Sequence, residues 1–111
     1  METREQRRWN RYDITLQVDV IAMIGGEQVV LKGRASDMSK GGMRLFVSRA
    51  IEPGISLSMT FHLPYQTKEL AIRGIVRNRE RFTHGVEFIR PTPQQQHVIE
   101  RTCSVFALLQ R

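Results

Sequence analysis

The sequence has few of the residues on which disulfide, metal and membrane chemistry depend. One cysteine, Cys103, is present among 111 residues, so the chain can form neither an internal disulfide nor a cysteine cluster for a metal. No apolar run approaches the roughly 20 residues that a membrane-spanning helix needs. The charged N-terminus is followed by no apolar segment of a signal peptide. We therefore expect a reducing, cytoplasmic compartment and no membrane span.

Groups that could carry out catalysis are also scarce. The three histidines, His62, His84 and His97, are scattered, and none has a second ligand at metal-binding spacing. Asp37 and Ser39 are close in sequence, but nothing in the sequence places a histidine beside them to complete a triad. The sequence therefore predicts a protein that is not an enzyme and that holds neither a metal nor a cofactor.

Positive charge is in excess. The 17 Lys and Arg residues outnumber the 11 Asp and Glu residues and give a formal net charge of +6. This balance favours anionic partners such as nucleotides, nucleic acids or acidic proteins, although a generally basic, soluble surface explains it equally well. Only 7% of the residues are aromatic, and most of these occupy apolar positions of expected strands or of the expected helix. This argues against an exposed stacking face for single-stranded nucleic acid.

Alternation of apolar and polar residues predicts six strands. They are expected at residues 14–24, 28–36, 43–47, 55–63, 70–77 and 85–89. Turn signals separate the strands, among them Gly25-Gly26 and Glu52-Pro53-Gly54. Residues 77–82 are expected to form a charged loop or strand end, at an exposed edge that discourages strand addition. Six strands at this spacing predict an all-β fold, either an antiparallel barrel or a sandwich.

Residues 92–110 are predicted to form a helix. Thr92 is the expected N-cap, Pro93 takes the first helical position, and Gln95 completes a capping box. An apolar stripe recurs at helical spacing and comprises Val98, Thr102, Val105, Phe106 and Leu109. The stripe is expected either to cover an open end of the barrel or to face a second subunit, so the protein is a monomer or a homodimer. Cys103 lies near the stripe and is expected to be a buried packing residue.

The densest polar segment is DMSKGG, at residues 37–42, which is expected to be a loop between two strands. Asp37 and Ser39 would present a carboxylate and a hydroxyl to one ligand. A carboxylate suits two adjacent donors, such as the N1–H and exocyclic amine of guanine. Gly41 and Gly42 permit close approach of the backbone. Taken alone, the segment is explained equally well as an Asx or serine turn.

A second polar segment, RRWNR at residues 7–11, lies in a basic arm that is expected to be flexible over residues 1–13. Arginine makes paired contacts with the O6/N7 edge of guanine and with phosphate oxygens. Arg7 and Arg11 could therefore close over a phosphorylated guanine ligand, and Trp9 adds a surface for stacking. The alternative is an arm that is simply solvated.

Taken together, these segments resemble the PilZ domain family. That family has R-x-x-x-R near its start, [D/N]-x-S-x-x-G about two strands later, and a G-[V/I]-x-F strand near its end. The matching segments here are residues 7–11, residues 37–42 and GVEFI at residues 85–89. The resemblance implies a six-stranded antiparallel β-barrel with a C-terminal helix, over residues 14–111. It also implies binding of cyclic di-GMP, a bacterial second messenger.

The resemblance also implies roles for individual residues. Arg7 and Arg11 would bind phosphate and the Hoogsteen edge of guanine, whereas Asp37 and Ser39 would hold the other guanine edge and the phosphodiester region. Gly42 would allow close backbone approach. Three further candidates for the ligand site are Arg8, Lys40 and Gly41. The family's mechanism is a switch, in which the flexible arm wraps over the nucleotide and changes the surface that a partner meets.

The register of the arginine motif is not unique, because Arg4 and Arg8 also satisfy R-x-x-x-R. Tyr12 and the strand that follows favour Arg7 and Arg11. Gln6, just before the motif, does not establish whether the site takes one nucleotide or a stacked pair. We therefore expect a cyclic di-GMP receptor that relays the signal to an unidentified protein partner, in control of motility, exopolysaccharide or biofilm. The alternatives are a PilZ-fold interaction module unresponsive to nucleotide and a small basic barrel that binds single-stranded nucleic acid.

Overall fold

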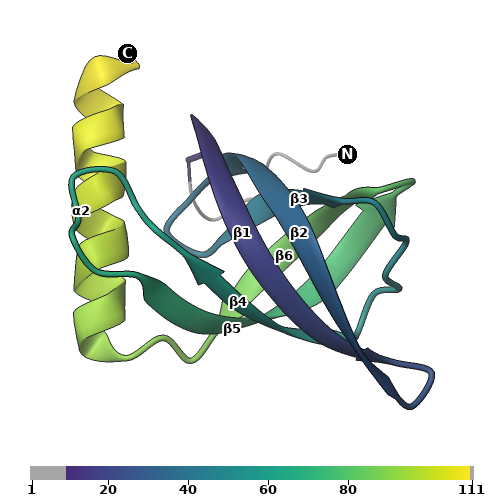
Figure 1. Cartoon of the computed structure of the whole chain (residues 1–111). Coiled ribbons are helices and arrows are strands. Elements are labelled where there is room, and N and C mark those ends of the chain that lie inside the picture. Colours follow the sequence, from purple (N-terminus) through teal and green to yellow (C-terminus); the bar gives the residue numbers. More distant parts are fainter. Residues whose placement is uncertain (1–9, 111) are drawn as a thin grey trace.

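The alternating segments turn their apolar side chains inward and close a six-stranded barrel (Figure 1). The computed structural model describes residues 10–110. The strands are β1 (Tyr12–Ile24), β2 (Glu27–Met38), β3 (Gly42–Val47), β4 (Ser56–Phe61), β5 (Leu70–Glu80) and β6 (Thr83–Ile89). Their order around the barrel is β1-β2-β3-β6-β5-β4, and every neighbouring pair is antiparallel. Pairing of β1 with β4 closes the circle, so the predicted antiparallel barrel is confirmed.

Strand β1 shows how the sequence pattern forms the wall. Its inward side chains expose 7% of their surface or less, and they are Ile14, Leu16, Val18, Val20 and Ala22. The residues between them face outward, as a period of two requires. The chain then reverses at Gly25 and Gly26, whose φ angles of 61° and 82° are those of a tight primed turn. The predicted glycine turn is therefore confirmed.

The loop expected over residues 37–42 is shorter than predicted. Asp37 and Met38 are the last residues of β2, and Gly42 is the first residue of β3. Met38 is completely buried, so its apolar side chain keeps this position on the inner face of the wall. The backbone N–H of Ser39 donates to the carbonyl of Gly42 at 2.8 Å, which closes the turn. Asp37 is consequently held on a strand and not on a loop.

Strand β5 continues beyond its expected end at Arg77 and leaves a two-residue turn before β6. Pairing with β6 keeps this arginine-rich segment in the wall, since Asn78, Arg79 and Glu80 lie opposite residues of β6, and two ion pairs accompany it. Arg77 Nε lies 2.6 Å from Glu87 Oε1, and Arg79 Nη2 lies 2.8 Å from Glu52 Oε2. On its other side β5 pairs with β4 only over residues 70–75, so the exposed edge that we expected at residues 77–82 stays a prediction.

Helix α2 (Pro93–Leu109) begins as predicted. The backbone N–H of Gln95 donates to Thr92 Oγ1 at 3.1 Å, and that of Thr92 donates to Gln95 Oε1 at 3.0 Å, forming a capping box. Figure 1 shows α2 standing beside the barrel. Within residues 10–110, no helix has both the length and the apolar character needed to cross a bilayer.

The buried stripe of α2 only partly matches the predicted one. Its members are Ile99, Thr102, Cys103 and Phe106, three of which join the barrel core. Val105 and Leu109, expected in the stripe, are 36% and 66% exposed. The helix is therefore rotated relative to the predicted orientation, and it packs onto the barrel with the face that carries Ile99 and Cys103. Burial raises the pKa of the Cys103 thiol to about 11, in keeping with its expected packing role.

The residue after the helix connects α2 to the start of β1. The side-chain amide of Gln110 donates from Nε2 to the carbonyl of Asp13 at 2.8 Å, and the N–H of Asp13 donates to Gln110 Oε1 at 2.8 Å. Asp13 faces Asp37 of β2 in the sheet register, so Gln110 occupies the opposite edge of β1. Strand β1 thus begins at Tyr12, inside the segment that we expected to belong to the arm.

Candidate functional site

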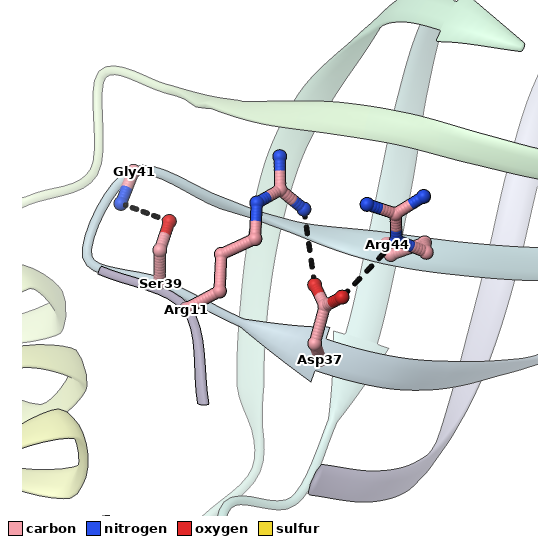
Figure 2. A network of polar contacts seen from close by, with 5 residues as sticks. All are labelled: Arg11, Asp37, Ser39, Gly41 and Arg44. Atoms are coloured by element: carbon pink, nitrogen blue, oxygen red, sulfur yellow. Dashed lines mark hydrogen bonds and ion pairs between the residues drawn. The ribbon is translucent and has the colours of Figure 1, made fainter. Parts of the chain in front are cut away.

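One carboxylate lies between two arginines from separate parts of the chain (Figure 2). Arg11 Nη1 is 3.1 Å from Asp37 Oδ1, and Arg44 Nε is 3.1 Å from Asp37 Oδ2. Arg11 lies just before β1, Asp37 lies near the end of β2, and Arg44 lies on β3. The structure therefore brings a residue of the predicted arginine motif, 26 positions upstream, into contact with the predicted aspartate.

The register of the strands explains this meeting. Asp37 is paired with Arg44 across β2 and β3, and side chains directly opposite on antiparallel strands lie close enough to interact. The register shifts between Ala35 and Asp37, and local irregularities of this kind, bulges among them, re-aim the side chains next to them. On the other side of β2, Asp37 is paired with Asp13, which brings the preceding Arg11 to the same outer surface.

The hydrogen-bond donors of this cluster outnumber the acceptors that they contact. Two guanidinium groups face one carboxylate, and the side chain of Asp37 is only 17% exposed, against 32% for Arg11 and 43% for Arg44. Each guanidinium carries five N–H donors, and its contact with Asp37 uses only one of them. A largely buried carboxylate is thus flanked by arginine donors that its contacts leave unused, and such donors suit an anionic ligand.

The remainder of the predicted motif forms the turn beside this cluster. The backbone N–H of Gly41 donates to Ser39 Oγ at 3.1 Å, so the serine makes the turn contact that the sequence left as an alternative. Figure 2 shows the Ser39 hydroxyl directed toward Gly41. The carbonyl of Gly41 accepts from Phe88 N–H at 2.9 Å, which ties the turn to the end of β6. Lys40 lies at the exposed tip.

Packing within the barrel already explains why residue 42 is a glycine. A Cβ at this position would overlap the backbone oxygen of Val86 on β6, against which β3 packs. Backbone carbonyls in a sheet cannot move aside as a flexible side chain can. Packing between β3 and β6 therefore requires the motif's last glycine, independently of any ligand.

The structure assigns positions to some of the predicted residues and leaves others untested. Arg7 and Arg8 lie outside the described residues, as does Arg4 of the alternative register. Arg11 is described and makes the contact with Asp37. Arg44 was not predicted as a site residue, although it makes the second of the two contacts.

Three aromatic side chains of the described residues are exposed, although most aromatics were expected at apolar positions, and the most exposed is Tyr65 at 71%. Phe46 and Phe82 are 41% and 46% exposed. Their rings meet edge to face with centroids 6.4 Å apart, and the guanidinium carbon of Arg34 lies 5.8 Å from the ring centre of Phe46. These contacts engage the two rings with each other and with Arg34.

A second polar cluster lies inside the barrel. His84 is completely buried on β6; the N–H of Ile51 donates to its Nε2 at 3.0 Å, which leaves Nδ1 to donate to the carbonyl of Leu45 at 3.2 Å. Burial lowers the pKa of His84, and the positive charge of Arg79 acts in the same direction. Among residues 10–110, no three His, Cys, Asp or Glu side chains are grouped so that they could hold a metal ion.

Three solved structures share this fold. The PilZ domain of CeSA from a cellulose-synthesizing bacterium is 18% identical, with a TM-score of 0.65 over 92% of this chain and 99% of that one. The inhibitor of motility MotI/DgrA of Bacillus subtilis is 20% identical, with a TM-score of 0.72, and this chain spans 58% of it. The PilZ domain of Escherichia coli YcgR with c-di-GMP is 13% identical, with a TM-score of 0.70 over 96% and 95% of the two chains.

The comparison of sequences gives the family. No curated protein matches the chain, and the low identities of the solved structures support the fold alone. A family model described as "PilZ domain" matches residues 2–104, which is most of the sequence. That stretch includes all three motifs on which the resemblance was based, together with the Asp37 cluster. The chain therefore belongs to the PilZ domain family, whose members are receptor and adaptor modules.

Proposed function

We propose that this protein is a receptor for cyclic di-GMP and that the Asp37 cluster is its binding site. The observation that carries the proposal is the ion pair between Arg11 and Asp37, which joins the arginine arm and the second motif in one place. The YcgR domain with c-di-GMP supports the choice of ligand, because it has the same fold.

The chemistry of guanine suits the groups that meet here. The Asp37 carboxylate can accept from N1–H and the exocyclic amine, while an arginine fork can donate to O6 and N7 or to phosphate oxygens. Ser39 lies on the adjoining turn, where its hydroxyl can donate to a phosphate oxygen while it accepts from Gly41. Adenine has no N1–H and carries no O6, so the same groups would select guanine over adenine.

Ligand binding would exchange one hydrogen-bond partner of Asp37 for another, so the carboxylate would never be without a donor. A carboxylate offers about four acceptor sites, so Asp37 can accept from guanine while Arg44 stays in contact. Arg11, which precedes β1, would move from Asp37 to the ligand together with Arg7. Because the buried charge always has a donor, the cost of opening the ion pair is small compared with leaving it unpaired.

Titration calorimetry with cyclic di-GMP tests this proposal. Wild-type protein should bind, and Arg11→Ala and Asp37→Ala should each weaken binding by roughly 10-fold to 100-fold, since hydrogen bonds to charged groups contribute about 1.5–3 kcal/mol. The control variant is Arg73→Gln, which removes an arginine from β5, the strand opposite β2 in the barrel. Cyclic di-AMP is the control ligand and should not bind.

Absence of heat from wild-type protein at high micromolar cyclic di-GMP would contradict the proposal. Equal weakening by Arg73→Gln would also contradict it, because it would indicate a nonspecific effect of net charge. Salt-sensitive binding of oligonucleotides without binding of cyclic di-GMP would favour a nucleic-acid-binding barrel instead.

We further propose that the cytoplasmic receptor passes the signal to a protein partner by ordering its arm over the ligand. A partner can distinguish the free receptor from the ligand-bound one if their surfaces differ, provided that the ligand favours one of the two states. Affinity capture with and without cyclic di-GMP tests this step: partner recovery should change with ligand. Recovery that is unchanged by ligand would indicate an interaction module that does not respond to nucleotide.

A further inference from the structure

Arg44 occupies a more fixed position than the arginines of the N-terminal motif. It lies within β3, where its neighbours Met43 and Leu45 are buried with exposures of 2% and 0%. The alternation of the strand therefore directs Arg44 outward, onto the same surface as Asp37. Arg11, in contrast, lies outside any strand, just before β1.

The guanidinium of Arg44 has donors to spare. It donates from Nε to Asp37 Oδ2, and its two terminal nitrogens make no other hydrogen bond or ion pair with residues 10–110. The residue opposite Arg44 on β6 is Gly85, which has no side chain with which to pair. Figure 2 shows that the two terminal nitrogens of Arg44 take no part in its contact with Asp37. With 43% of its side chain exposed, Arg44 presents these donors at the surface of the site.

Two other arginines of the barrel wall each have a carboxylate of their own. Arg77 has Glu87 to itself on the neighbouring strand, and Arg79 has Glu52. Arg44 must share Asp37 with Arg11. Among the ion pairs of the described chain, the Asp37 cluster is thus the one place where two arginines share a single carboxylate, and their unused donors could hold an anion.

We propose that Arg44 is a ligand-binding residue that contacts a phosphate oxygen of the bound nucleotide, in addition to holding Asp37. This inference rests on the proposed binding of cyclic di-GMP. The planar fork of arginine matches the spacing of phosphate oxygens, and Nε remains on Asp37 while the terminal nitrogens take the phosphate. Arg44 and Asp37 together form the preorganised part of the site, to which Arg11 is added when the arm closes.

The test compares the affinity of Arg44→Gln, Arg44→Lys and the control Arg73→Gln for cyclic di-GMP. Arg44→Gln should bind about 10-fold or more weakly, as expected for loss of a charge-assisted hydrogen bond. Arg44→Lys should recover only part of the loss, because lysine keeps the charge but not the fork. Arg73→Gln should stay within about twofold of wild type, because it removes the same charge from β5, which lies opposite β2 and is separated from β3 by β6. Circular dichroism and thermal melts establish that each variant is folded.

A second measurement separates contact with phosphate from positioning of Asp37. In one experiment, Arg44→Gln is combined with Asp37→Asn and the double variant is titrated with cyclic di-GMP. In the other, wild type and Arg44→Gln are titrated with phosphorothioate analogues of cyclic di-GMP, in which sulfur replaces a non-bridging oxygen. If Arg44 contacts phosphate, its loss should still weaken binding in the Asp37→Asn protein, and the effect should shrink with one phosphorothioate isomer. If the double mutant binds too weakly to measure, the phosphorothioate series decides.

The outcomes are distinguishable from those of the proposed function. Wild-type protein that does not bind cyclic di-GMP overturns both proposals. Wild-type binding with Arg44→Gln as tight as Arg73→Gln overturns the inference about Arg44 alone. An Arg44 effect that vanishes in the Asp37→Asn background and is identical for oxygen and sulfur ligands also overturns it, because Arg44 would then act only through Asp37.

Discussion

The outer and inner faces of the β3–β6 wall carry two polar clusters of opposite character. On the outer face, Arg44 lies opposite Gly85 and shares Asp37 with Arg11, so hydrogen-bond donors are in surplus. On the inner face, one residue away along each strand, His84 lies opposite Leu45. His84 is neutral and completely buried, and each of its ring nitrogens has one partner.

The difference separates a structural cluster from one able to bind a ligand. A buried network in which every group is satisfied stabilises one arrangement and leaves nothing for a ligand to contact. The His84 cluster meets that condition and ties Ile51, in the segment between β3 and β4, to the wall. The outer cluster does not meet it, since its arginines retain unused donors. We therefore expect the inner cluster to control stability and the outer one to control ligand affinity.

The largest expected effect on stability is that of His84→Ala. The change leaves Ile51 N–H and the Leu45 carbonyl without a partner and opens a cavity, so the free energy of unfolding should fall by about 2–5 kcal/mol. Urea denaturation measures the fall. The affinity for cyclic di-GMP, measured where the variant is folded, should remain within about twofold of wild type. A fully stable His84→Ala, or one that is stable but has lost the ligand, would contradict the division between the two faces.

Gly42→Ala is expected to disturb both faces to an intermediate degree. The added methyl group would overlap the Val86 carbonyl, so β3 and β6 must separate, at a cost of about 1–3 kcal/mol. Because Arg44 lies two residues further along β3, cyclic di-GMP binding should weaken as well. Thermal melting and titration of the same preparation measure the two effects. Weaker binding with unchanged stability would show that Gly42 serves the ligand alone and not the packing of β3 on β6.

The smallest expected effect is a pH dependence that arises from the inner cluster. Because the pKa of His84 is lowered in the folded protein, the unfolded chain binds more protons below about pH 6.5, the ordinary histidine value. The contribution of His84 to stability should therefore be constant above that pH and fall as the pH is lowered toward the folded-state pKa. Urea denaturation between pH 5 and 8 measures the slope.

A control identifies the histidine responsible for that slope. His62 and His97 are exposed, so the double variant His62→Gln/His97→Gln should keep the acid-induced loss of stability. A variant that lacks His84 should show a flatter profile. Loss of the slope in the His62→Gln/His97→Gln variant would rule out His84 as the source of the pH dependence.

The parts of the fold that depend on local pattern could be predicted from the sequence. Alternating residues gave six strands, paired glycines at residues 25–26 gave a tight turn, and Thr92 with Gln95 gave the capping box. Each of these signals acts within a few residues of the chain. The ends of strands were less accurate, because they depend on pairing with other strands: Asp37 and Met38 extend β2 since β1 and β3 both pair with them.

The parts of the site that depend on register were missed, although the sequence contained signals for them. A tight hairpin centred on Lys40 and Gly41 places Asp37 opposite Arg44, as the structure shows. Likewise, the alternation of β6 puts His84 on the same inward face as Val86 and Phe88. Both inferences require a decision about which residues form the turn and which face is inward. Composition and motif spacing do not contain that information.

The contact between Gln110 and Asp13 has a consequence for how the ends of the fold come apart. A glutamine side chain carries the same amide group as a peptide bond, and here it gives Asp13 both of the hydrogen bonds that another strand would supply. Fraying of the last helical turn therefore strips the first strand of a neighbour, and loosening of that strand frees the helix end. We therefore expect the two segments, 97 positions apart, to open together in local unfolding.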